Sequence, residues 1–513
     1  MVFVKLYNIF ISLKNSRSRS CSFNDPEGGR NHMKLSRRQM LKLSGASLGG
    51  LALGGPLSGF GSPPNTKTSD PSQRNSLYDA LPVFQLGTPL QENEMRITFL
   101  GTSCIPRLSQ ECNSIYVEVG TGDQFVFDCG SGVTAKYNAL GVPMSKMDKI
   151  FFTHIHADHT SDLTHIYGFG PAEDRKSPLY IWGPKNSEWT YHDPDGNIRG
   201  PYQDGTRAFC ENFRNLMRWH TESFSFGSTR YTNNPTPQQV MENWGLTEIP
   251  VKVGEDDFDD DGFAIFPIEL DWSLSGKSSR DNVAYDNPTT GVRITHFPAI
   301  HTRRGSVSYK LEYKGLSMIF SGDTKPNTEM VSQAGGVDVL IHEMVMPAYV
   351  WALKNSGLPP DDPEFIKAYD YAMQVQNSSH TPQGAFGYLL SRMSPPPRLA
   401  VATHFQAADD TIASAMQSVR NHYPAGEVTF AADLMVLTVS ADRILQQRAV
   451  VSDFAFYPVG LLLDVKTSYY WKWHDPITKD YAVPDPTAQV DLATEILPND
   501  PNTNAFNYRE DGY

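Results

Sequence analysis

The chain has 513 residues, a formal net charge of −13, 40% hydrophobic residues and 20% charged residues. A chain of this length can bury a large core and can form two to four domains or one elaborated catalytic domain. Because proteins bind polyanions mainly through Lys and Arg, the acidic balance predicts that nucleic acid is not a partner.

The N-terminal region has the pattern of an export signal. The stretch "MKLSRRQMLKLSGASLGGLALGG", residues 33–55, places Arg37 and Arg38 before a short, glycine-rich apolar segment. It resembles a twin-arginine signal, which implies a periplasmic or secreted protein that meets the twin-arginine translocation machinery during export. An unrelated basic tail is the alternative. We expect translation to begin at Met33, and removal of residues 1–62, which carry a net charge of +7, leaves −20.

Composition predicts four segments. Residues 1–62 form an N-terminal extension with the signal, and residues 63–80 form a linker rich in Ser, Pro, Asn and Thr. Residues 81–440 form the main domain, with an insertion at about 186–288 that we expect to be irregular or to form a lid over the substrate. Residues 441–513 form an aromatic and Pro/Asn/Asp-rich extension that we expect to pack on the domain.

Within the main domain, short apolar runs predict strands in the first half. They are residues 96–101, 114–119, 124–130, 149–154 and 178–184. After the insertion, strands are expected at 291–301, 306–313, 316–324 and 337–343, then at 398–405, 426–431 and 434–440. Helical spacing at 363–376, 382–393 and 409–423 separates some of them. Two β-rich halves closed by helices predict an α/β layered sandwich.

Two local features of the chain carry weaker predictions. The acidic run at residues 255–262 imitates the start of a calcium loop, but the twelfth position, Ile268, is not Glu, so a solvated turn is favoured. Cys104 and Cys112 are the one close pair of cysteines, and spacing alone leaves open whether they form a disulfide.

A dense cluster of metal-seeking side chains follows the strand at 149–154. In "THIHADHTSDL", His154, His156, Asp158 and His159 lie in the loop and at the start of a helix. Three further candidates also come just after apolar strands, where sites of layered α/β folds lie: His301, Asp323 and His404. Imidazole and carboxylate without thiolate suit zinc, with manganese or iron as alternatives.

These motifs resemble, in order, those of the metallo-β-lactamase superfamily: "THIHADHTSDL", the lone His301, "FSGDT" and "ATHF". The resemblance covers residues 95–440 and implies an αββα sandwich with a dinuclear metal site. It implies that His154, His156 and His301 hold one ion, that Asp158, His159 and His404 hold the other, and that Asp323 bridges them. Two ions about 3.5–4 Å apart would generate a bridging hydroxide near neutral pH.

Other motifs are similar to the branch that contains RNase Z and arylsulfatase-like exported hydrolases: "FLGTS", "LYIWGP", "SGDT", "IHE" and "SSHTPQGA". This resemblance implies that His380 assists the oxyanion or leaving group, with Glu343 as its orienting carboxylate. Asp128 is a candidate acceptor for a ligand His N–H. The alternatives are that His380 caps a helix and that Glu343 and Asp128 have purely structural roles. We interpret His296 and His342 as core residues.

The sequence departs from RNase Z after "FDCG", where Ser131, Gly132 and Val133 replace the expected Gly-Glu-Gly-Thr. With the acidic charge, this disfavours tRNA processing, and an aspartate at position 323 disfavours a penicillin-hydrolysing enzyme. We therefore expect a metal-dependent hydrolase that cleaves a small sulfate or phosphate ester, in which Asp158 orients the nucleophile and His380 assists the leaving group.

Three alternatives to this function stay open: a lactone or carboxylic ester hydrolase, a hydrolase of specialised-metabolite biosynthesis, and a non-catalytic metal-binding protein. The sequence does not decide whether the chain forms a homo-oligomer.

Overall fold

The computed structural model describes residues 82–223, 236–254, 262–274, 282–302, 304–406 and 412–451, and two short strands, β19 (Asn499–Asp500) and β20 (Ala505–Phe506). The proposed signal and linker, the acidic run at 255–261 and most of the C-terminal extension lie outside the described residues. Within the described ranges, no helix combines the length and hydropathy needed to cross a membrane.

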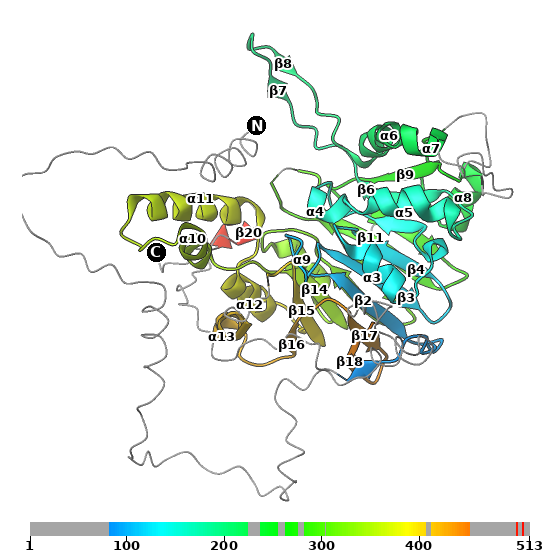
Figure 1. Ribbon diagram of the computed structural model, residues 1–513. Coiled ribbons are helices and arrows are strands. Elements are labelled where there is room, and N and C mark those ends of the chain that lie inside the picture. The colour runs from blue at the N-terminus through cyan, green and yellow to red at the C-terminus, as the bar shows by residue number, and fades with distance from the viewer. Residues whose placement is uncertain are drawn as a thin grey trace, which may run out of the picture. The chain divides into compact units, whose positions relative to one another are not determined.

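Two mixed β-sheets form the centre of the domain (Figure 1). The nine-stranded sheet has the order β1 (Val83–Phe84), β18 (Ile444–Ala449), β17 (Met435–Val439), β2 (Met95–Gly101), β3 (Ser114–Val119), β4 (Gln124–Phe127), β5 (Lys149–Phe151), β6 (Leu179–Pro184), β9 (Ile265–Leu270). The seven-stranded sheet has the order β10 (Val283–Asn287), β11 (Val292–Pro298), β12 (Val307–Tyr313), β13 (Leu316–Phe320), β14 (Val339–Glu343), β15 (Leu399–Thr403), β16 (Val428–Phe430).

The main core lies between the two sheets, because alternate strand residues from both point inward. Phe127 of β4 meets Tyr309 of β12 and Phe320 of β13 at ring-centroid distances of 5.6 and 6.0 Å. Phe151 of β5 stacks on Trp182 of β6 at 4.5 Å. Phe151 also meets Tyr309 edge-on at 5.5 Å, which fixes β5, and with it the loop that follows, against the second sheet.

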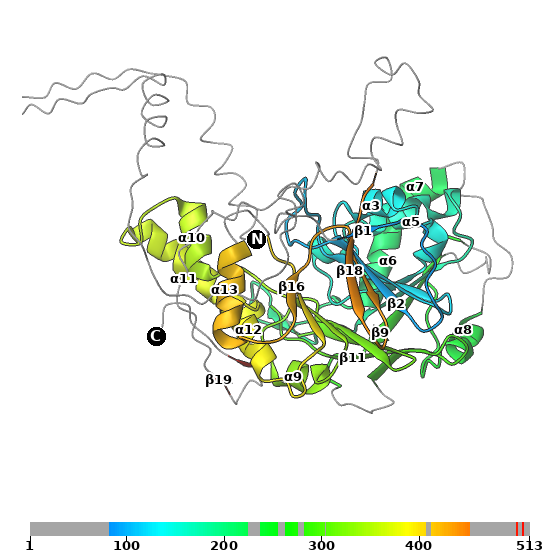
Figure 2. The same cartoon turned by 90° about the horizontal axis from the view of Figure 1, so that it is seen from below.

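Helices cover both outer faces, as Figure 2 shows with α12 and α13 on one side and α3 and α5 on the other. The nine-stranded sheet is covered by α3 (Val133–Ala139) and α5 (Leu163–Phe169), with the short α4 (Ala157–Thr160) between them in the chain. The seven-stranded sheet is covered by α9 (Thr328–Ala334), α12 (Gln383–Ser391) and α13 (Ile412–His422). The predicted αββα sandwich is therefore confirmed.

The segment 186–288 contains more regular structure than its composition indicated. It forms α6 (Thr206–Leu216), α7 (Arg218–Ser223) and α8 (Pro237–Asn243), and a hairpin of β7 (Tyr191–His192) and β8 (Ile198–Arg199) that projects from the sheets (Figure 1). It also supplies β9 and β10, which are edge strands of the two sheets. The sequence pattern did not predict β9, because its segment "IFPIEL" contains a proline and proline counts against a strand. Proline is tolerated in a strand mainly at the edge of a sheet, which is where β9 lies.

A second helical pair that the sequence indicated only in part lies between β14 and His380. It consists of α10 (Ala348–Ser356) and α11 (Pro363–Ser379), which pack through Tyr349 and Phe365. Cys104 and Cys112, whose pairing the sequence left open, are both free thiols.

Candidate metal centre

The loop after β5 and the first turn of α4 supply four of the seven candidate ligands. β5 is a short, fully buried strand paired in parallel with β4 and β6, so the chain leaves the sheet at the same edge as its neighbours. His154 and His156 lie in the loop, and Asp158 and His159 lie in the first turn of α4. His154 and His159 are buried, whereas His156 is exposed.

Three strands of the second sheet bring the other candidates to the same place. His301 lies in the turn between β11 and β12, Asp323 follows β13, and His404 follows β15 in a left-handed conformation with φ of 60°. Because β13, β14 and β15 run parallel, the residues after their carboxyl ends meet at one edge. The sandwich thus joins sequence positions that lie up to 250 residues apart.

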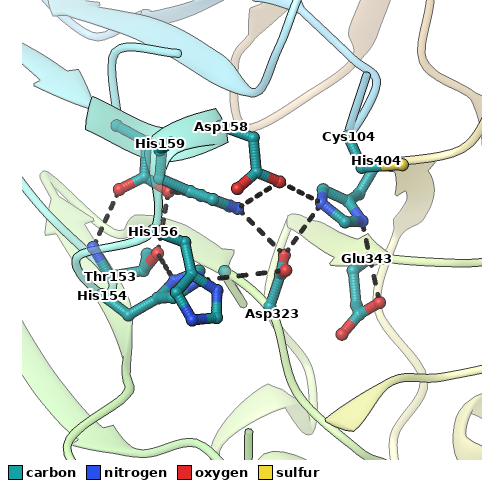
Figure 3. Close-up of polar contacts among 12 residues, drawn as sticks. Cys104, Thr153, His154, His156, Asp158, His159, Asp323, Glu343 and His404 are labelled. Atoms are coloured by element: carbon teal, nitrogen blue, oxygen red, sulfur yellow. Dashed lines mark hydrogen bonds and ion pairs between the residues drawn. The ribbon is translucent and has the colours of Figure 1, made fainter. Parts of the chain in front are cut away.

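The structure brings all seven predicted ligands together in two groups with the composition expected from the sequence. One group is His154, His156 and His301, and the other is Asp158, His159, Asp323 and His404; within each group the ligand atoms lie within 4.8 Å of one another. Asp323 also faces the first group. Its Oδ1 lies 3.3 Å from Nε2 of both His159 and His404, and its Oδ2 lies 3.8 Å from His301 Nε2 and 4.0 Å from His154 Nε2 (Figure 3).

The unpaired atoms in this cluster fit a bound cation. Nε2 of His154, Nε2 of His159 and Oδ1 of Asp323 are buried and have no hydrogen-bond partner. A buried polar atom without a partner costs about 1–3 kcal/mol, so three of them in these two adjoining groups indicate that another group satisfies them. Imidazole nitrogens and a carboxylate oxygen are ligands for zinc and related divalent ions.

The electrostatics of the first ligand group also suit metal binding. Burial, together with the neighbouring histidines, holds the pKa of His154 well below its usual range and lowers that of His301 to about 3. Both rings are therefore neutral at physiological pH, which is the form that binds metals. The pKa of Asp158 is lowered although burial opposes ionisation, because His159 and His404 stabilise the carboxylate.

Hydrogen bonds behind the ligands fix which ring nitrogen faces the centre. Fully buried Asp128 accepts from Nδ1 of His159 at 2.7 Å and from the backbone N–H and Oγ1 of Thr153 at 2.8 Å each. Nδ1 of His154 lies 3.1 Å from the same Thr153 Oγ1, and Nδ1 of His301 lies 3.0 Å from the carbonyl oxygen of Ser379. Each Nδ1 is thus engaged by an acceptor, which leaves Nε2 free to bind an ion.

His380 and Glu343 form a buried pair beside the second group. Nδ1 of His380 lies 2.9 Å from Oε2 of Glu343, and Glu343 also accepts the backbone N–H of Thr324. Burial opposes protonation of His380, but Glu343 outweighs it and raises the pKa to about 9. The His380 ring lies 5.0 Å from that of His301, so a protonated imidazole borders the centre. His380 ends α11 and does not cap α12, whose N-cap has no side-chain bond.

The two histidines interpreted as core residues lie in strands and bond to the backbone. His296 Nε2 lies 3.0 Å from the carbonyl oxygen of Asp271, and His342 Nδ1 lies 2.7 Å from that of Glu343. Sequence reasoning did not find the supporting Thr153, although a Thr directly before the first histidine of the motif is a possible signal for it.

A cavity of about 400 Å³ opens beside the first group of ligands. His154, His156 and His301 line one side, and the other side comes from the loop after β6, from α6 and from the turn between β11 and β12. The charged residues that line it are Lys185, Asp204 and Arg304. Sequence reasoning did not find these residues, because none of them belongs to a recognisable motif.

Comparison with known proteins gives three kinds of similarity. Residues 95–183 match a family model described as Anti-Pycsar protein Apyc1. A Ribonuclease Z from Methanothermobacter thermautotrophicus is 35% identical over 278 residues, 50% of this chain and 75% of the relative. A Ribonuclease Z from Halalkalibacterium halodurans is 25% identical over 260 residues, 48% of this chain and 75% of that relative.

Among solved structures, the metallo-β-lactamase fold protein YhfI from Bacillus subtilis is similar at a TM-score of 0.39 and 15% identity. The match covers 68% of this chain and all of YhfI.

These relatives correct one prediction. The expectation that nucleic acid is not a partner is wrong, because the matched relatives are named as ribonucleases. Net charge averages over the whole surface and does not report the potential at one site, where two cationic side chains line the cavity beside the histidines. The 35% identity across three quarters of a curated relative shows the family: the chain belongs to the ribonuclease Z family of metal-dependent hydrolases, with a metallo-β-lactamase fold.

Proposed function

We propose that the protein is a dinuclear metal-dependent phosphoesterase. The observation that carries this proposal is that three buried ligand atoms, from His154, His159 and Asp323, have no hydrogen-bond partner within the two adjoining ligand groups. His154, His156 and His301 would hold one divalent ion, Asp158, His159 and His404 the other, and Asp323 would contact both. Zinc is the preferred ion, with manganese or iron as alternatives. When bound, such ions activate water and stabilise negative charge on ester oxygens.

The chain's own residues supply orientation and a proton. Asp158 is the most accessible carboxylate of the centre, with a side chain that is 25% exposed, and it is placed to orient the attacking water. His380 holds a proton on an imidazole that Glu343 anchors through Nδ1, so Nε2–H is available to a departing oxygen. Fully buried Glu343 contacts no solvent, so it acts by positioning His380.

The relatives and the cavity together favour a phosphate ester as the substrate. Ribonucleases cleave phosphodiester bonds, and Lys185 and Arg304 in the cavity complement an anionic substrate. RNA therefore belongs among the substrates to be tested. Sulfate esters carry the same kind of charge and stay within the proposal as a second class, while lactones and carboxylic esters do not use the cationic residues.

A substrate panel with matched leaving groups tests this proposal. Metal-loaded protein is assayed with bis(p-nitrophenyl) phosphate, p-nitrophenyl phosphate, sulfate and acetate, and with single-stranded RNA. We expect turnover of at least one phosphate ester, loss of turnover with a chelator, and loss of both metal and turnover in Asp323→Ala. Turnover of the acetate alone, or no turnover by metal-loaded protein, would refute a phosphoesterase.

We also propose export through the twin-arginine route, on the basis of Arg37 and Arg38. Residues 33–62 fused to a reporter should direct it to the periplasm, and replacement of both arginines by lysine should abolish export. Export that survives this replacement and a blocked twin-arginine translocase would refute the route.

A further inference from the structure

We infer that Arg304 makes the cavity beside the metal centre selective for substrates with a second anionic group. This inference rests on the proposed function, because it places the scissile ester at the first group of ligands. The cavity is where a substrate would enter: of the three histidines that line it, His154 and His301 are buried and His156 is exposed. A ligand that reaches the centre past His156 must occupy the cavity.

Arg304 is fixed to the centre by the chain itself. It lies three residues after His301, in the turn that joins β11 to β12. The turn is closed by a hydrogen bond of 3.0 Å from the N–H of Ala299 to the carbonyl oxygen of Ser306, and Val307 N–H donates to the carbonyl oxygen of Thr153 at 2.9 Å. Gly305 takes a positive φ of 111°, which presents Arg304 at the exposed rim of the cavity.

Among the residues that the structure describes, Arg304 is also the cation of the cavity that has no counter-charge paired with it. Lys185, the other cation, pairs with Glu188 at 3.1 Å and with Asp271 at 3.2 Å. Among the described residues, Arg304 has no ion pair and no hydrogen bond through its side chain. Asp204, the carboxylate among the described residues that line the cavity, accepts from the N–H of Ser187 at 2.9 Å and from its Oγ at 2.7 Å.

The remaining wall comes from the inserted segment and combines polar and apolar side chains. Gln203, just before α6, and Asn212, on α6, line the cavity, and Phe209 of the same helix adds one aromatic face. A volume of about 400 Å³ has room for more than the reacting ester group. A guanidinium binds a carboxylate or phosphate through two parallel hydrogen bonds, so Arg304 favours a ligand that carries a second anionic group.

Non-hydrolysable phosphonates separate recognition from turnover. The probes are two matched pairs: 4-phosphonobenzoate with its carboxamide, and 3-phosphonopropanoate with its carboxamide. In each pair the phosphonate group is the ligand for the metal ions, and the two members differ only in whether they carry the second negative charge. Binding to metal-loaded protein is measured by calorimetry. We expect the carboxylate of at least one pair to bind about fivefold tighter than its carboxamide. This gain in affinity lies between the gains typical of an exposed ion pair and of a bidentate contact.

Variants then attribute the preference to Arg304. In Arg304→Gln the ratio of the two affinities should fall to about one, and Arg304→Lys should restore part of it. The control is Arg392→Gln, an exposed arginine over Tyr388 that does not line the cavity, which should keep the wild-type ratio.

Absence of a preference in both pairs, no phosphonate binding, or a preference that survives in Arg304→Gln would each overturn the inference. Hydrolysis of esters without a preference refutes this inference alone. A preference without any hydrolysis refutes the proposed function alone.

Discussion

Replacing Asp128 with asparagine tests how the tautomer of a ligand histidine is controlled. The Asp128 carboxylate accepts three hydrogen bonds, two from Thr153 and one from His159 Nδ1. If the amide oxygen of Asn keeps the bond to the backbone N–H, its NH₂ group takes the place of Oδ2 and meets the N–H of His159. Two donors then face each other, and His159 can relieve this by moving its proton to Nε2, the atom that faces Asp323.

The expected effect is a loss of metal affinity. Removal of such a supporting contact typically weakens metal binding 10- to 100-fold, which corresponds to about 1.4–2.8 kcal/mol. Competition with a chromophoric chelator measures the affinity, and circular dichroism with thermal melting of the metal-free protein checks the fold.

Asp162→Asn is the matched control. Asp162 Oδ2 accepts the backbone N–H of Thr134 at 2.8 Å and its Oγ1 at 2.7 Å, so it repeats the aspartate–threonine contact without a ligand histidine. We expect this variant to keep wild-type affinity. If folded Asp128→Asn binds metal as tightly as Asp162→Asn and the wild type do, Asp128 does not set the tautomer of His159.

Further predictions concern metal removal, a glycine, a buried lysine and the proton donor. Chelation should lower the melting temperature, because free ion at 100 times its Kd stabilises the folded state by about 2.7 kcal/mol; an unchanged melting temperature would argue against a resident ion. Gly322→Ala should destabilise the fold by about 1–3 kcal/mol in urea titrations, because φ is +58° and the methyl would lie 2.4 Å from a threonine Cβ. Gly315→Ala, at +82° with nothing within 4 Å, should cost less, and equal costs would contradict the steric argument. Burial lowers the pKa of Lys149, but Asp123 and the preceding aspartate outweigh this and raise it above 10.5. The stabilisation of the fold by charged Lys149 is therefore complete below pH 10.5 and is lost as the pH rises through the folded-state pKa. The midpoint of urea unfolding should then fall more steeply above pH 10.5 in the wild type than in Lys149→Met. Parallel curves of this midpoint against pH would exclude the linkage. His380→Ala should lower kcat about 10²- to 10⁴-fold for esters with poor leaving groups and less for p-nitrophenyl esters, and an equal loss for both would exclude a proton donor.

The sequence predicted the sandwich well where strands are buried on both faces. In β2, β5 and β14 every residue is buried and most are apolar, so their pattern is visible locally. It did not predict the edge strands β9 and β10. β9 contains a proline and β10 is only half apolar, because an edge strand needs neither a complete hydrogen-bond ladder nor burial on both faces.

The prediction about nucleic acid failed for a different physical reason. Formal charge was summed over the chain, whereas recognition depends on the few groups that face the ligand. Lys185 and Arg304 are ordinary cations in the sequence, and only their position beside the histidines gives them a role in the proposed recognition.

By itself, the sequence determined the identity and order of the candidate ligands. Each of them follows an apolar strand or starts a helix, and the carboxyl ends of parallel strands meet at one edge whatever the details of packing. Only the tertiary structure decided that one oxygen of Asp323 faces each group and that Glu343 holds His380. It also decided that Lys185 is paired while Arg304 has no partner within the described part of the chain. These features depend on angstrom-scale contacts between residues distant in the chain, and no local pattern of residue types encodes such contacts.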